Sequence, residues 1–475
     1  MSKRLREIAH GLPRACRTQY PIVPPNKPFR IYAGPFSLSY RKNTWQLTGN
    51  IWLTCLPHPT VRFDGAVTSG GLIDRPLSTV TLQLPNRAGF AQASITGTTW
   101  GEVLHLRGRV KGFFRLGPNR MVRSVKLHVP NFHNYIGARV VFRGRYGPWP
   151  SRSRLTLMHE EWRIYLDQDP QLDQRENSLR ANGGYAMTHV GIIERADGRA
   201  FRRRDIEDLS SCLHRFLSFA RGFWCGPLVL EGMGRRGALW TEWSSEALLT
   251  DWQGVASWFP LRDVSEVTVA FDGFCELWNR PLWKRPLAGA VHWYIEANLN
   301  AGAIEGSLIL AHTTLELLAW IFVVGDRGVL SASHFDKLSS QERLRELLST
   351  LRIPTAIPAS LQAVWKWAAA TRPQHSVADD GPSVITRMRN ALVHPKPARR
   401  SVLEQASGPA RVQARQLALL YVELVILALS GYRGKFINRL RTGVTPTEAT
   451  AVVPWADRAP FTLDHMEGPA YRIAK

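Results

Sequence analysis

The chain has 475 residues, of which 44% are hydrophobic and 21% are charged, and its formal net charge is +23. This length suffices for two or three domains, each with its own core, in a protein of ordinary globular composition. Its five scattered cysteines include no C-x-x-C pair, which excludes a zinc ribbon and a disulfide framework.

The excess of basic residues is spread along the chain. Before position 284 there are 38 basic and 23 acidic residues, and between 284 and 441 there are 20 basic and 11 acidic ones. Such a chain is expected to attract polyanions, with nucleic acid before an anionic membrane surface. An arginine-rich proteome explains the excess equally well.

The compartment predicted from the sequence is the cytoplasm. The N-terminus lacks the apolar core of a secretory signal. The apolar run 307–324 has His312 and Glu316 at its centre, and a charge there costs about 2.5–3.5 kcal/mol in a membrane. We therefore expect a buried helix in a soluble protein that has no membrane partner, no cofactor and no metal site.

The N-terminal half is expected to be rich in strands. Residues 1–29 are basic and proline-rich and are predicted to be an extended tail. In residues 30–200, short alternating segments separated by Gly, Pro and Asn indicate an antiparallel sandwich or barrel, and we expect a β-sandwich-like domain. Residues 201–283 are predicted to add an α+β extension with a helix over 205–223. Its G-x-G-x-x-G segment, 232–237, is interpreted as a hairpin turn.

Residues 284–441 are predicted to form an all-α bundle, followed by a C-terminal tail over 442–475. Apolar periodicity predicts helices near 287–300, 302–324, 340–351, 358–370, 382–394 and 411–430. The second and the last are apolar nearly all round and are expected at the bundle centre. Gly431 is expected to cap the last helix in a left-handed conformation, with Tyr432 packing back.

The helix predicted over 382–394 has an unusual polar side. Its apolar stripe consists of Val384, Ile385, Met388, Ala391 and Leu392. Asn390 and His394 are four apart and share a face, whereas Arg389 and His394 are about 140° apart on an ideal helix. Two alternatives bring arginine and imidazole together: the turn before Pro395 unwinds, or a second copy of the helix completes the site.

The hexapeptide from Arg389 to His394 resembles the Arg-x(4–6)-His signature of HEPN ribonucleases. Similar spacings occur elsewhere in this arginine-rich chain, for example at Arg285 and His292, but the helical context favours position 389. The later Gly-Tyr-Arg-Gly segment, 431–434, resembles the ApeA-like branch of that superfamily, which is associated with bacterial anti-phage defence. The resemblance implies a HEPN-like bundle, an RNA substrate, a homodimer and an abortive-infection role.

In this interpretation the catalytic residues of a metal-independent endoribonuclease are Arg389, Asn390 and His394. RNA supplies the 2′-hydroxyl nucleophile, His394 transfers a proton and Arg389 stabilises charge on the phosphate. Asn390 orients His394 or binds the ribose. A helix C-terminus is expected to favour the protonated imidazole. Weaker supporting or RNA-binding candidates are Glu316, Lys396, Arg399 and Arg400, and the N-terminal region is expected to sense a phage-derived trigger.

Two alternatives remain open at this point. The three residues at 389, 390 and 394 are ordinary polar groups near a helix end, or the bundle is a catalytically inactive HEPN-type module for dimerisation or nucleic-acid binding. His312 and Glu316 fit a satisfied polar pair in the core as well as an acid supporting the site. Trp and Tyr interleaved with Arg in the N-terminal half fit a base-stacking surface or the core of a sandwich.

Overall fold

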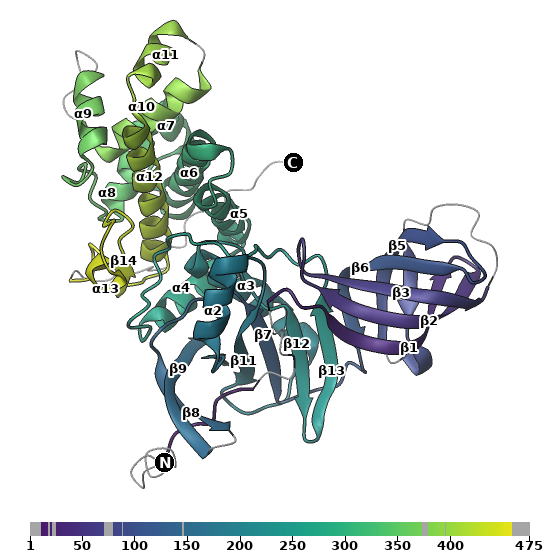
Figure 1. Ribbon diagram of the computed structural model, residues 1–475. Helices are drawn as coiled ribbons and strands as arrows, with labels where there is room; N and C mark the ends of the chain where they lie inside the picture. Colours follow the sequence, from purple (N-terminus) through teal and green to yellow (C-terminus); the bar gives the residue numbers. More distant parts are fainter. Residues whose placement is uncertain are drawn as a thin grey trace. The chain divides into compact units, whose positions relative to one another are not determined.

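The computed structural model describes residues 11–17, 20, 25–70, 79–87, 89–144, 147–372, 379–394 and 396–457 (Figure 1). The chain forms two compact units: unit 1 is Met1–Gly254 with Leu261–Ser265, and unit 2 is Val255–Pro260 with Glu266–Lys475. Unit 1 is built on antiparallel strands and unit 2 on helices, which confirms the multidomain α+β class.

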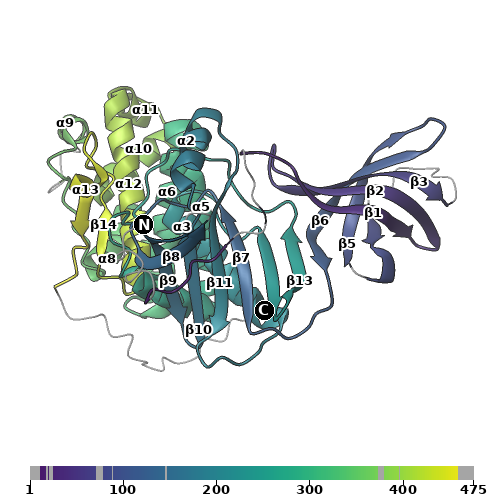
Figure 2. The same ribbon diagram turned by 60° about the horizontal axis from the view of Figure 1, so that its bottom comes forward.

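The first part of unit 1 is a closed barrel. In the described part of the chain, six antiparallel strands pair in the order β3-β2-β1-β4-β5-β6, and β3 also pairs with β6 (Figure 2). Their bounds are β1 Phe29–Tyr40, β2 Asn43–Thr54, β3 Thr60–Ser69, β4 Val80–Gln83, β5 Gly89–Thr99 and β6 His105–Leu116, with the short helix η1 at Pro85–Arg87. Alternate side chains, such as Phe36, Trp45 and Phe63, fill the interior.

Of the two architectures that the alternation allowed, the structure has the barrel, continued by a sheet, in place of the expected sandwich-like domain. Alternation along a strand is the same in both architectures, and closure depends on the long-range pairing of β3 with β6. Beyond β6 the sheet continues through β13, β12, β7, β11, β10, β9 and β8. These are β7 Ser124–Pro130, β8 Ala138–Gly144, β9 Gly147–His159, β10 Trp162–Gln168, β11 Met187–Arg195, β12 Val229–Gly234 and β13 Gly237–Ser244.

The predicted division at residue 200 is absent from this sheet. β12 and β13, which belong to the predicted α+β extension, pair between β6 and β7 of the earlier region. They are joined by a hairpin in which Gly234 pairs with Gly237, which confirms the interpretation of the glycine-rich segment. The helices of unit 1 are α2 Leu172–Asn182, η2 Arg203–Ile206 and α3 Glu207–Arg221.

Part of the predicted N-terminal tail is tied to unit 1. Arg14 forms a parallel bridge with Val141, and the backbone N–H of Cys16 donates to the Asp167 carboxylate at 2.7 Å. The hydroxyl of Tyr20 donates to Glu231 at 2.7 Å. Residues 1–10, 18–19 and 21–24 of the predicted tail lie outside the described residues.

Unit 2 contains all six helices predicted for the bundle. Its elements are α4 Val267–Asn279, α5 Pro281–Asn298, α6 Ala303–Ala319 with the π-helical η3 Trp320–Asp326, α7 Ala332–Lys337, α8 Ser340–Thr350, α9 Gln362–Ala370, α10 Gly381–Val393, α11 Pro397–Glu404, α12 Gly408–Leu429, β14 Lys435–Ile437, α13 Pro446–Ala449 and β15 Thr450–Val452. Because α4 belongs to unit 2, the boundary lies near residue 266 and not at the predicted 283/284.

Two long apolar helices form the centre of unit 2, as predicted. Ala303–Asp326 and Gly408–Leu429 are long and apolar enough, by length and composition alone, to cross a membrane. However, 56% and 78% of their most apolar windows are buried inside the structure. Burial of this kind is typical of core helices and is compatible with a soluble protein.

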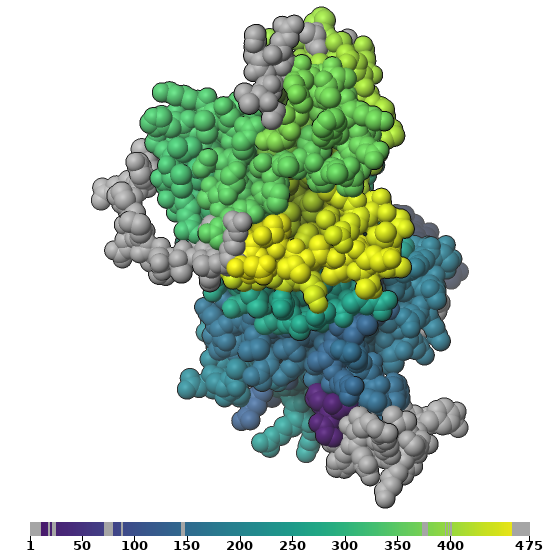
Figure 3. All heavy atoms as spheres, turned by 90° about the vertical axis from the view of Figure 1, so that its left-hand side faces the viewer, coloured from purple at the N-terminus to yellow at the C-terminus, as the bar shows by residue number. Residues whose placement is uncertain are grey.

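The end of α12 is capped as the sequence predicted. Gly431 has a left-handed φ of 65°, and the N–H of Tyr432 donates to the carbonyl of Leu427 at 3.0 Å. The described part of the predicted tail is folded: β15 pairs with β14, and the indole of Trp455 donates to the carbonyl of Tyr432 at 2.6 Å. Figure 3 shows this closing segment, in yellow, against the green helices of unit 2.

Candidate active site

α10 is fixed at its N-terminal end. The carboxylate of Asp380 caps the helix by accepting from the N–H of Ser383 at 2.9 Å. The guanidinium of Arg345, on α8, binds the same carboxylate through two hydrogen bonds of 2.7 and 3.1 Å. Of the predicted apolar stripe, all members are buried except Leu392, which is partly exposed. The C-terminal end of α10 is therefore held in place by a rigid first half.

The last turn of α10 opens at His394. The helix ends at Val393, and His394 has extended backbone angles of −111° and 121° while its N–H still donates to the carbonyl of Asn390 at 3.1 Å. The imidazole is exposed. This geometry corresponds to the first of the two predicted alternatives, in which the end of the helix unwinds. Pro395, the residue expected to stop the helix, lies outside the described residues.

Two titratable groups respond to the charge of Arg389. Its positive charge lowers the pKa of both Glu316 on α6 and His394 at the end of α10. One nitrogen of its guanidinium, Nη1, donates to the side-chain oxygen of Asn390 at 3.1 Å. Its buried Nε has no hydrogen-bond partner in the described part of the chain. Arginine, carboxylate and imidazole are therefore brought into one neighbourhood within a single chain.

A polar cluster, consisting of His312, Glu316, Ser340 and Thr386, joins three helices behind Arg389. The hydroxyl of Ser340 donates to Glu316 Oε1 at 2.7 Å and lies 3.0 Å from Nε2 of His312. That same nitrogen is 3.3 Å from the hydroxyl of Thr386, and Nδ1 of His312 is 3.4 Å from Glu316 Oε2.

Glu316 carries a negative charge at neutral pH. Burial raises the pKa of its carboxyl group, but hydrogen bonds from His312 and Ser340, together with the charges of His312 and Arg389, lower it to about 2. Its side chain is 27% exposed, whereas that of His312 is fully buried. The carboxylate is thus held at the edge of the core, where it balances the charge of Arg389.

The pKa of His394 is shifted in the direction opposite to the predicted one. Partial desolvation and three nearby cations lower the pKa of its imidazole below the ordinary value of 6.5. These cations are, in decreasing order of effect, Arg399, Arg389 and Lys396. This direction is opposite to the one expected from the helix C-terminus alone. The imidazole is therefore neutral at pH 7.

The four weaker candidate residues, Glu316, Lys396, Arg399 and Arg400, lie in different parts of unit 2. Glu316 lies in the polar cluster and near Arg389. Lys396 is exposed and Arg399 is partly exposed at the start of α11, and both act on His394. Arg400 follows in the same helix, and its side chain lies outside the described residues. Sequence reasoning missed Ser340 and Thr386; a threonine within the apolar stripe of α10 was the only signal for either.

Because the pKa of Glu316 is lowered in the folded protein, the stability of the protein is expected to depend on pH in the acid range. The folded pKa of about 2 is below the ordinary 4.5, so the stabilisation is complete above about pH 4.5 and is lost as pH falls toward 2. Glu316→Gln is expected to flatten the fall of the unfolding temperature over this range. Glu276→Gln, at an exposed glutamate of α4, is the control. Equal pH profiles for both variants would contradict the assignment.

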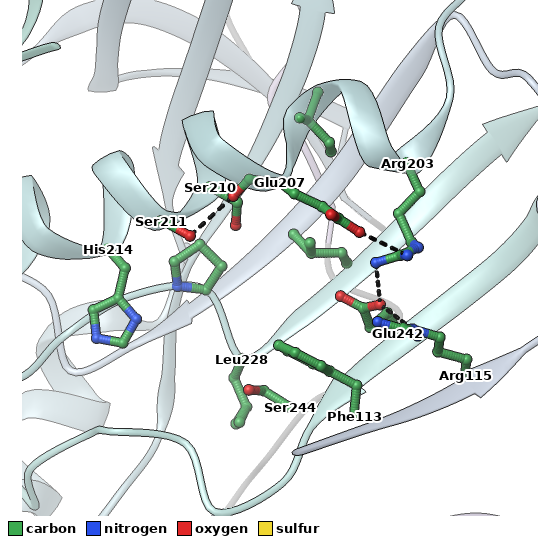
Figure 4. A pocket seen from close by; sticks show the side chains of 13 residues that line it. Phe113, Arg115, Arg203, Glu207, Ser210, Ser211, His214, Leu228, Glu242 and Ser244 are labelled. Atoms are coloured by element: carbon green, nitrogen blue, oxygen red, sulfur yellow. Dashed lines mark hydrogen bonds and ion pairs between the residues drawn. The ribbon is translucent and has the colours of Figure 1, made fainter. Parts of the chain in front are cut away.

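Unit 1 contains a separate cavity of about 360 Å³ between α3 and the strands β6, β12 and β13 (Figure 4). On one side, Arg115 and Arg203 both donate to Glu242 Oε2, at 2.7 and 2.9 Å, and Arg203 also pairs with Glu207 at 2.7 Å. On the other side of the cavity, burial lowers the pKa of His214 to about 4. The two guanidinium groups are matched by two carboxylates, so the cavity has no excess charge to attract an ion.

Glu242 is expected to stabilise unit 1. Its side chain is 7% exposed and holds both arginines, so Glu242→Ala leaves two guanidinium groups without this partner and should cost about 1–3 kcal/mol. Glu207→Ala, at a 54% exposed carboxylate, is the matched control and should cost less than about 1 kcal/mol. Urea unfolding measures the free energy lost in each variant. Equal losses in Glu242→Ala and Glu207→Ala would contradict the larger role assigned to Glu242.

The comparisons with known proteins concern most of the chain. Residues 117–255 match the family model of the YopA central domain, and residues 280–449 match that of the YopA C-terminal domain. The second match includes Glu316 and the whole of α10. No solved structure matches the chain. The chain is similar to the SPbeta prophage-derived uncharacterized protein YopA of Bacillus subtilis (strain 168), with 27% identity over 444 residues. The aligned part covers 91% of this chain and 96% of that protein, so the similarity includes both units.

Proposed function

We propose that the chain is a metal-independent endoribonuclease of HEPN type in which Arg389, Asn390 and His394 act on RNA. The observation that carries the proposal is that Arg389 lies near enough to both the exposed imidazole of His394 and the carboxylate of Glu316 for its charge to lower the pKa of each. These groups share the end of a helix whose other end is capped and ion-paired.

The chemistry follows from the protonation states. A neutral imidazole at His394 can accept the proton of a ribose 2′-hydroxyl, and the oxygen then attacks the adjacent phosphorus. The guanidinium of Arg389 stabilises the charge that builds on the non-bridging oxygens. The bond from phosphorus to the 5′-oxygen breaks as the bond to the 2′-oxygen forms, and the 5′-oxygen takes up a proton from water or from the imidazolium that the first transfer produced, so the products are a 2′,3′-cyclic phosphate and a 5′-hydroxyl end.

The neighbouring residues have supporting roles in this proposal. Asn390 accepts a hydrogen bond from Arg389 through its side-chain oxygen, so in this proposal it orients the guanidinium, and its side-chain NH2 is left to orient His394 or to bind the ribose. Glu316, held by Ser340, positions Arg389 from the side of the core. Lys396 and Arg399 add cationic charge that attracts the RNA backbone. Two copies of the exposed end of α10 meet in a homodimer, which supplies a second imidazole for proton transfer.

The proposed biological role is abortive infection in the bacterial cytoplasm, with unit 1 sensing a phage-derived trigger. The prophage origin of the similar B. subtilis protein is in keeping with a role in phage–host conflict. Expressed in a bacterial host, the wild-type chain should reduce phage plating, whereas His394→Ala should not. His292→Ala, at an exposed histidine of α5, should protect as the wild type does. Protection by His394→Ala equal to the wild type would contradict the proposal.

One observation favours a second candidate function, a catalytically inactive module for dimerisation or nucleic-acid binding. Arg389 already has Asn390 as a hydrogen-bond acceptor and Glu316 as a nearby counter-charge, and both compete with a phosphate group. This alternative predicts RNA binding that falls steeply with salt and is unchanged in His394→Ala, with no cleavage in any state.

A further inference from the structure

The outer wall of the barrel carries a groove of about 520 Å³ that none of the preceding functions uses. It lies over strands β2, β3, β5 and β6, and its lining includes Trp52, Arg62, Asp64, Thr98 and Arg107. Its size falls within the range of small-ligand sites in proteins. Gly97 pairs with Arg107 across β5 and β6 and has no side chain to fill the space beside it.

Strand register places arginine and tryptophan in one row around this wall. Arg30 pairs with Trp52, Trp52 pairs with Arg62, and Arg62 pairs with Arg109, from β1 through β2 and β3 to β6. Directly paired residues on neighbouring strands point to the same side of a sheet. The guanidinium of Arg30 lies over the Trp52 ring, 5.6 Å from its centroid. The row therefore combines a flat aromatic surface with three cations.

The cations of this wall have weak partners or none. Arg62 is exposed and has no ion pair or hydrogen bond among the described residues of the chain. Arg107 pairs at 3.4 Å with Asp64, and both side chains are more than half exposed. From Phe29 to Leu116 the sequence has ten basic and three acidic residues. Exposed pairs of this kind contribute little, so an incoming anion can replace Asp64 at low cost.

We propose that this groove binds single-stranded nucleic acid, with its phosphates on Arg62 and Arg107 and a base against Trp52. Single-strand sites combine a cationic groove that follows the backbone with aromatic side chains on which bases stack. Thr98 and its neighbours offer hydroxyl groups at the groove edge. Trp100, which is 63% exposed, follows β5 directly and provides a second aromatic side chain close in sequence to the groove.

Single strands suit the groove better than the other polyanions. A duplex offers phosphates but keeps its bases stacked, so Trp52 would have no partner. An acidic peptide would satisfy the arginines but not the aromatic ring. The inference stands on the barrel alone and does not depend on cleavage by Arg389 and His394.

The test uses the full-length chain carrying His394→Ala, so that RNA stays intact. Fluorescence anisotropy would follow binding of labelled oligouridine and oligothymidine, each about 12 nucleotides long, within the span of known single-strand sites. Comparing the two strands separates RNA from DNA as the ligand. Binding to at least one strand is expected, with an affinity that falls between about 50 mM and 200 mM salt.

Three further substitutions distinguish binding in the groove from non-specific attraction of nucleic acid to a basic protein. Trp52→Ala should weaken binding on the order of 10-fold or more through lost stacking. Arg62→Ala and Arg107→Ala should each weaken it and reduce the slope of log affinity against log salt by about 0.7. Arg199→Ala, at an 81% exposed arginine outside the barrel, removes the same charge as a control and should leave binding unchanged.

The inference is overturned if neither strand binds, or if Arg62→Ala and Trp52→Ala weaken binding no more than Arg199→Ala. It is also overturned if polyglutamate or a DNA duplex competes as well as the single strand, because the wall would then be a general polyanion surface. Arg62 is exposed, so its variant tests the groove even where Trp52→Ala lowers stability. Absence of cleavage by the wild-type chain, with binding retained, would instead count against the proposed ribonuclease only.

Discussion

His394→Ala is expected to lower the rate of RNA cleavage about 10²–10⁴-fold, the usual contribution of a general acid or base. The imidazole is exposed at the end of α10, so the substitution removes the proton acceptor without disturbing the core. Initial rates on a labelled single-stranded RNA, measured in the activated state, would give the ratio directly.

The matched control for this substitution is the pair Arg285 and His292. These exposed residues of α5 have a similar arginine–histidine spacing but lie outside the proposed site. Alanine at either position should leave the rate unchanged. Because nearby cations lower the pKa of His394, the wild-type rate should rise with pH and level off with a midpoint below 6.5. Equal losses in His394→Ala and His292→Ala would contradict the assignment.

Glu423→Ala is expected to destabilise unit 2 by about 3–5 kcal/mol, the cost of removing one partner from a buried ion pair. Glu423 and Arg439 are 0% and 1% exposed, and two nitrogens of Arg439 donate to the carboxylate at 2.6 and 3.0 Å. The hydroxyl of Tyr294 donates to the same group at 2.6 Å. Burial lowers the pKa of Arg439 and the Glu423 charge raises it above its ordinary value, so the guanidinium is charged beside Glu423 and is left buried without this partner in Glu423→Ala.

Hydrogen exchange of the α12 amides under native conditions would measure this loss within unit 2. Glu404→Ala, at an exposed glutamate of α11, is the control and should change stability by no more than about 0.5 kcal/mol. Glu423→Gln keeps the shape of the side chain and part of its hydrogen bonding. Its loss of stability should therefore lie between those of Glu423→Ala and Glu404→Ala. A loss below about 1 kcal/mol in Glu423→Ala would contradict a structural role for the pair.

The helices of unit 2 were predictable because their signals are local. The apolar stripe of α10, the break after Val393 and the glycine cap at Gly431 all depend on residues within a turn or two of each other. The short helices α7 and α11 were missed. Each has eight residues or fewer, which is too short for apolar periodicity to stand out.

The architecture of unit 1 was only partly predictable because it depends on long-range pairing. Alternation in the strands predicted an antiparallel fold, but nothing local indicates that β3 closes onto β6. The same limit explains why the place of the predicted extension in the sheet was not foreseen, since β12 and β13 pair far back in the sequence with β7 and β6.

The candidate site was predicted in its residues but not in its electrostatics. The spacing of Arg389, Asn390 and His394 was visible in the sequence. The pairing of Glu316 with His312 was visible too, but its hydrogen bond from Ser340 was not, because Ser340 lies on a different helix and has no distinguishing pattern around it. The direction of the His394 pKa was wrong for a similar reason: Arg399 and Lys396 approach it only once the chain has turned into α11.

The most direct measurement is the chemistry of the RNA ends produced without metal. Purified wild-type chain, activated and in excess chelator, should release fragments with 2′,3′-cyclic phosphate and 5′-hydroxyl ends, while Arg389→Ala and His394→Ala should release almost none. Fragments that carry 3′-hydroxyl ends, or equal yields from the wild type and both variants, would contradict cleavage by the arginine and the imidazole at the end of α10.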